Sequence, residues 1–117
     1  MSIAYLGEKT FLDEVNATGQ VWVARGFHRN VYAMELDATG LSLPVWSSRD
    51  KAADFLKHAQ LVGPHYEPYP VPVDVFTAKW LSDRTRDITE LQINPDGITT
   101  RVLILTNEEF VAARAVP

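Results

Sequence analysis

The residues best placed for covalent chemistry are two serines, Ser47 and Ser48, which follow a predicted strand and precede a predicted helix. Nucleophilic serines of one large hydrolase class occupy such a turn, but they need the flanking glycines of a GxSxG motif, which this sequence lacks. A serine at this position also caps the following helix, because its hydroxyl oxygen accepts a hydrogen bond from a first-turn N–H. We therefore interpret one of the two serines as a helix cap and predict no catalytic residue.

Three residues spaced by four, Asp50, Asp54 and His58, line one face of the same predicted helix. Two carboxylates and an imidazole could bind a divalent cation or transfer a proton. However, Lys51 and Lys57 are interleaved with them opposite an apolar stripe, which is typical of a solvated helix surface. The sequence also has no cysteine and no glycine-rich phosphate-binding motif, so we predict neither a metal site nor a cofactor.

Two tryptophans are the candidates for an interaction site. Trp46 lies at a predicted strand–helix boundary, and Trp80 lies on the apolar stripe of a later helix. Both positions favour burial, but a partly exposed tryptophan is a typical interface anchor. Together with Arg49 they are the residues that we predict for contact with a partner, or for a cleft between sheet and helices.

The loop at residues 26–29 (GFHR) mixes aromatic and basic side chains. It could contact an anion or a partner. As a connection between two strands it needs no such role, and we favour this simpler interpretation.

Composition limits the class of protein. The 117 residues, 46% hydrophobic and 22% charged, are typical of one globular domain, which we expect to span residues 1–117. A net charge of −4 with scattered basic residues argues against nucleic-acid binding. No apolar stretch is long enough for a membrane span, and the first residues do not resemble a secretory signal, so we expect a cytoplasmic protein.

Apolar periodicity and turn residues predict the elements that position these side chains. The predicted helices are residues 8–18, 47–59, 74–84 and 107–115, and the predicted strands are 20–25, 31–36, 41–46, 66–73, 88–93 and 101–106. Short loops favour a meander over residues 20–46 and a closing hairpin over residues 88–106. Both faces of strands 20–25 and 101–106 are apolar, which predicts interior positions.

Strand 66–73 (YEPYPVPV) has prolines at alternate positions. Alternate N–H groups of a strand point to the same side, so all the missing donors lie along one edge, which predicts an edge strand. A proline-rich ligand for a partner is the less favoured interpretation. The predicted fold is α+β, with a single, mostly antiparallel sheet of about six strands packed with about four helices.

Several runs of residues resemble a family of short, mainly bacterial proteins catalogued as domain of unknown function 2750. They are 17–23 (ATGQVWV), 43–46 (LPVW) followed by Ser48 and Ala52, 75–76 (VF), 79–81 (KWL), and the closing strand before a Glu-rich helix start. The resemblance covers about residues 8–115. It implies a small stand-alone α+β domain, and it supplies no activity and no catalytic residues.

Two functions follow as hypotheses. The first is a non-enzymatic binding or interaction module, which the absence of a catalytic constellation favours. The alternative is a small-molecule-binding protein or an enzyme that uses a cleft between sheet and helices. A protein partner and self-association through a sheet edge are both compatible with the sequence.

Overall fold

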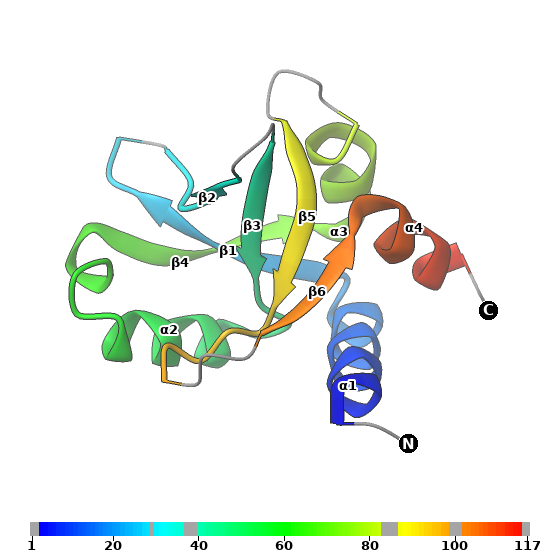
Figure 1. Cartoon of the computed structure of the whole chain (residues 1–117), viewed down its shortest axis with the longest axis horizontal. Helices are drawn as coiled ribbons and strands as arrows, with labels where there is room; N and C mark the ends of the chain where they lie inside the picture. The colour runs from blue at the N-terminus through cyan, green and yellow to red at the C-terminus, as the bar shows by residue number, and fades with distance from the viewer. Residues whose placement is uncertain (1–2, 29, 37–39, 83–86, 99–101, 116–117) are drawn as a thin grey trace.

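The computed structural model describes residues 3–28, 30–36, 40–82, 87–98 and 102–115. Its elements are α1 (Ile3–Thr18), β1 (Gln20–Gly26), β2 (Met34–Glu35), β3 (Leu41–Val45), α2 (Arg49–His58), the 3₁₀ helix η1 (Gly63–His65), β4 (Tyr66–Pro72), α3 (Val73–Val75), the π-helix η2 (Phe76–Trp80), β5 (Ile88–Ile93), β6 (Leu103–Thr106) and α4 (Asn107–Ala115) (Figure 1). The ends predicted near residue 84 for the third helix and at residue 101 for the last strand lie outside the described residues.

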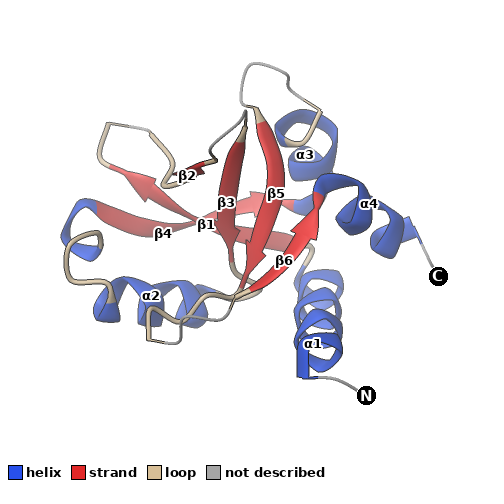
Figure 2. Cartoon of the chain, viewed as in Figure 1, coloured by secondary structure: helices blue, strands red, loops and turns tan. Residues whose placement is uncertain are grey.

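The strands form two sheets (Figure 2). One is a two-stranded antiparallel ribbon of β1 and β4, and the other has the strand order β2-β3-β5-β6. Among the described residues of the second sheet, β3 and β5 pair in parallel and the other neighbours are antiparallel. The α+β class and the mainly antiparallel pairing are therefore confirmed for the described residues, but the prediction of a single sheet is wrong.

The predicted meander fails because another strand takes the place of the hairpin partner of β1. The chain does turn back after β1, and Val31 lies opposite Arg25. Continuing that register would place Met34 opposite Trp22. Instead, Trp46 occupies this edge and exchanges two backbone hydrogen bonds with Trp22, each 2.8 Å from N to O. Residues 31–36 therefore leave β1, and only Met34–Glu35 form a strand, on β3.

The proline-rich strand β4 lies at a sheet margin, as predicted. Among the described residues it pairs only with β1, in a register that runs from Gln20 opposite Pro72 to Gly26 opposite Tyr66. The N–H of Val73, directly after β4, also points toward β1 and donates to the carbonyl of Gly19 at 2.9 Å. The prolines thus leave the paired side intact and remove donors from the other.

The ribbon separates two groups of buried side chains. On one face of the ribbon lies a core shared with α1, the four-stranded sheet and α4. It consists of Phe11, Val15, Val21, Val23, Leu43, Val45, Val71, Val73, Phe76, Ile88, Leu91, Ile93, Leu105 and Phe110. The other face packs on α2, around Ala24, Trp46, Ala52, Phe55 and Leu56. Helices therefore cover the ribbon on both sides.

The last strand, β6, lies at a margin of its sheet. Its apolar sequence predicted an interior strand, and this prediction is wrong. It pairs with β5 alone among the described strands. Leu105 is buried, whereas Ile104 is 41% exposed on the opposite face. The pattern misleads because a single apolar side chain is tolerated on a solvent-facing surface.

Two helix starts are capped by side-chain hydroxyl groups, and the first of these caps was predicted. The Ser48 hydroxyl accepts a hydrogen bond from the N–H of Lys51 at 3.2 Å. At α4 the N–H of Glu109 donates to the Thr106 hydroxyl (3.1 Å), and the Glu109 carboxylate accepts from the N–H of Thr106 (3.0 Å). The third helix differs from the prediction, because it begins at Val73, before Asp74, and continues as η2.

Replacing Thr106 with alanine should lower the free energy of unfolding by about 1 kcal/mol, the usual value of such a cap. Urea denaturation followed by circular dichroism measures this loss. Glu108→Ala is the matched control, because Glu108 is exposed in the same helical turn and makes no cap bond. An equal loss in both variants would contradict the capping role.

Candidate interaction surface

The structure separates the three residues predicted as contacts. Trp46 is fully buried on the α2 side, with its ring centroid 5.0 Å from that of Phe55. Trp80 is half-buried and packs against the other core, beside Phe76. Arg49 is exposed at the start of α2. The three side chains therefore do not line one cleft, and Trp46 offers no surface to a partner in this conformation.

Ser47 is the buried member of a partly buried polar cluster that joins distant segments. Its hydroxyl donates to the Glu14 carboxylate (3.1 Å), and its N–H donates to Asn94 Oδ1 (2.9 Å). The Asn94 amide donates back to the Ser47 hydroxyl at 3.1 Å, and Lys51 Nζ forms an ion pair with Glu14. These contacts connect α1, α2 and the loop after β5. Because Ser47 is 0% exposed, its hydroxyl is not presented to a substrate as a nucleophile.

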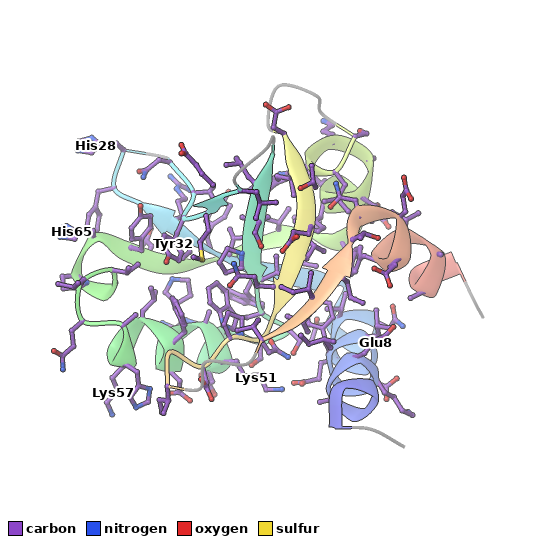
Figure 3. All side chains as sticks on the ribbon, in the orientation of Figure 1. Glu8, His28, Tyr32, Lys51, Lys57 and His65 are labelled. Atoms are coloured by element: carbon purple, nitrogen blue, oxygen red, sulfur yellow. The ribbon has the colours of Figure 1, made fainter. Side chains whose placement is uncertain are left out.

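The outer end of the β1–β4 ribbon carries an exposed aromatic and basic surface. We call it the ribbon end and define it as Arg25, Phe27, His28, His65 and Tyr69. Phe27 is 71% exposed, the Arg25 guanidinium carbon lies 4.5 Å from the centroid of the Tyr69 ring, and both histidines are exposed. Figure 3 shows His28 and His65 at the same end of the molecule.

Strand register creates this surface. Gly26 lies opposite Tyr66, and Arg25 lies opposite Glu67, so the turn after β1 meets the residues just before β4. The sequence indicated the aromatic and basic loop at residues 26–29 but not its neighbours, which come from about forty residues further along the chain. Arg29 lies outside the described residues.

Hydrogen bonds hold the ribbon end in place. The N–H of Gly26 donates to the Asn30 carbonyl at 2.7 Å, and the N–H of Tyr32 donates to the Ala24 carbonyl at 2.9 Å. The Asn30 amide donates to the Tyr66 hydroxyl at 3.2 Å, which links the turn to β4. An exposed phenyl ring on a braced turn, beside a cation stacked on a ring, suits contact with another protein surface.

The acids and histidine considered for metal binding stay on the solvent side of α2. Asp50, Asp54 and His58 are all exposed. Within the described part of the chain, no group of three or more acidic, histidine or cysteine side chains has an arrangement that could hold a metal ion. In the same residues, no helix has both the length and the apolar composition of a transmembrane span.

These features define a small α+β domain in which a ribbon is packed between a helix and a four-stranded sheet. The family model described as protein of unknown function (DUF2750) matches residues 8–112, which reach from α1 into α4. The chain belongs to this family, as the resemblance of its sequence runs implied. A comparison with curated proteins finds no match.

Proposed function

We propose that this domain is a non-enzymatic interaction module that binds a protein partner through the ribbon end. The observation that carries the proposal is Phe27, a large apolar side chain that is 71% exposed on a turn fixed by hydrogen bonds. When a partner covers an exposed aromatic ring, the free energy of the complex falls by roughly 25 cal/mol per Å² of apolar area removed from water. Because hydrogen bonds hold Gly26, Asn30 and Tyr32 on either side of Phe27 and His28, less conformational entropy opposes binding than for a free segment.

The neighbours of Phe27 give the surface its chemical character. Arg25 is held over the Tyr69 ring, and both residue types are enriched at interface centres. His28 and His65 add polar rings that can donate or accept hydrogen bonds. A partner that offers an apolar pocket with hydrogen-bonding groups around it would match this arrangement.

The alternative function, a small-molecule site near Trp46, Arg49 and Trp80, has less support. Trp46 and Trp80 pack in different cores, and the polar cluster around Ser47 has no exposed nucleophile. Arg49 remains a candidate contact residue, because it is exposed at the start of α2.

Site-specific photo-crosslinking tests the proposal in cells that encode the protein. A photoreactive phenylalanine analogue is placed at Phe27 and, as the matched control, at Ile98, which is 66% exposed in the loop after β5. We expect a discrete crosslinked protein from position 27 and not from position 98. The same products from both positions, or none from position 27, would contradict the proposal.

Phe27→Ala should weaken binding of the captured partner at least tenfold, or about 1.4 kcal/mol, because truncating an anchor costs more than the ~1 kcal/mol that most interface residues do not reach. The stability of the domain should not change, since the side chain is mostly in water. Isothermal titration calorimetry measures the affinity, and Ile98→Ala serves as the control. Equal affinities for the two variants would place the binding surface elsewhere.

A further inference from the structure

Two of the sheet margins in the described part of the chain, β4 and β6, differ in how they meet solvent. β4 carries three prolines that remove donors from its free side. β6, at the margin of the four-stranded sheet in Figure 2, has the sequence LILT, with neither proline nor charge. Natural edge strands are usually protected by such residues, because an unprotected edge offers its backbone groups to another strand.

Hydrogen bonds around β5 identify which backbone groups of β6 face outward. The N–H of Asn94, directly after β5, donates to the Val45 carbonyl of β3 at 2.9 Å. Backbone groups alternate sides along a strand, so those of Leu91 and Ile93 point the other way, toward β6. Their register partners are Leu105 and Leu103. The N–H and C=O of Ile104, between these two, therefore point away from the sheet.

A second contact supports the same alternation. The N–H of Thr106 donates to the Glu109 carboxylate at 3.0 Å, in the turn that begins α4. The backbone groups of Thr106 thus point to the same side of β6 as those of Ile104, which is the outer side. Ile104 is 41% exposed, so its apolar surface reaches solvent at this margin.

We propose that β6 pairs antiparallel with β6 of a second copy of this chain, across a two-fold axis that passes beside Ile104. In this register each Ile104 N–H donates to the Ile104 carbonyl of the other copy, and Val102 of one copy lies opposite Thr106 of the other. The two four-stranded sheets would become one continuous sheet. This inference does not depend on the ribbon end, which lies on the other sheet.

A second copy fits this edge better than a flexible peptide does. The outward groups are few, so the pairing gains few hydrogen bonds, and a peptide would lose conformational entropy in making them. A second β6 is already ordered by β5. The facing residues Val102, Ile104 and Thr106 are uncharged. The Glu109 carboxylate beside Thr106 would lie near Val102 of the other copy and not opposite a second carboxylate, so two chains of net charge −4 can approach here.

Ile104→Pro tests the pairing selectively. Proline has no N–H and is tolerated at an edge position whose N–H faces outward, so the monomer should keep its melting temperature. Sedimentation velocity on the full chain, at concentrations up to roughly 1 mM so that a weak association is populated, should show wild type approaching twice the monomer mass. The variant should stay monomeric. Wild type that stays monomeric, or a variant that dimerises equally, would overturn the proposal.

Two further measurements keep the test decisive if the proline variant does not fold. Ile104→Lys places two like charges face to face across the axis, and we expect at least a tenfold weaker dimer at low salt, with recovery at high salt. A synthetic peptide of residues 102–106 should not bind the wild-type chain when that chain is monomeric. Peptide binding without dimerisation would assign this edge to an extended partner segment and overturn the homodimer.

Discussion

Replacing Trp46 with alanine should lower the free energy of unfolding by about 3–5 kcal/mol, the range expected for removal of a fully buried large aromatic side chain. Trp46 is 0% exposed, and its indole N–H donates to the Pro95 carbonyl at 2.8 Å. The variant would leave a cavity beside Phe55 and an unpaired carbonyl in the loop that crosses α2. Urea denaturation followed by far-ultraviolet circular dichroism measures the loss.

Two controls separate the contributions to this effect. Trp46→Phe keeps most of the buried apolar area but removes the hydrogen bond and part of the ring volume, so it should cost clearly less than alanine. Trp80→Ala should also cost less, because Trp80 is only half-buried at the rim of the other core. A loss for Trp46→Ala no larger than that for Trp80→Ala would contradict the central position assigned to Trp46.

Asn94→Ala should lower the free energy of unfolding by about 2–4 kcal/mol, from two separate causes. The backbone of Asn94 is left-handed, with φ of 48°, a conformation that asparagine adopts more readily than alanine. Its side chain also accepts the N–H of buried Ser47, which would otherwise lack a partner. Chemical denaturation again provides the measurement.

Asn94→Gly distinguishes the two causes. Glycine tolerates the left-handed backbone but has no side chain to accept from Ser47, so this variant should recover only part of the loss. Stability equal to wild type in Asn94→Gly would show that the Ser47 N–H does not depend on Asn94. Stability equal to that of Asn94→Ala would show that backbone conformation contributes nothing.

Features set by nearby residues could be predicted from the sequence. Ser48 and Thr106 cap their helices because the groups they bond lie three residues away. The edge position of β4 followed from alternating prolines, whose missing donors are a property of the strand itself. In each case the deciding interaction, or the lack of one, is encoded within a few residues.

Features set by distant residues could not be predicted in this way. The choice of Trp46 over Met34 as the neighbour of Trp22 depends on how the buried Trp46 ring packs beneath α2, and this choice divides the strands into two sheets. The same limit applies to the candidate site. Residues 26–29 were visible as an unusual loop, but His65 and Tyr69 join them only through the ribbon register.

The pairing of β1 with β4 has a consequence for biosynthesis. A ribosome releases Val21 and Val23 long before their partners in the ribbon, Val71 and Tyr69, have been made. Parallel pairing of β3 with β5 requires a similar wait. The nascent chain thus exposes its apolar strands until most of it has been translated, so folding must complete as one late, cooperative event. Chaperones that shield apolar strands would assist folding most during elongation.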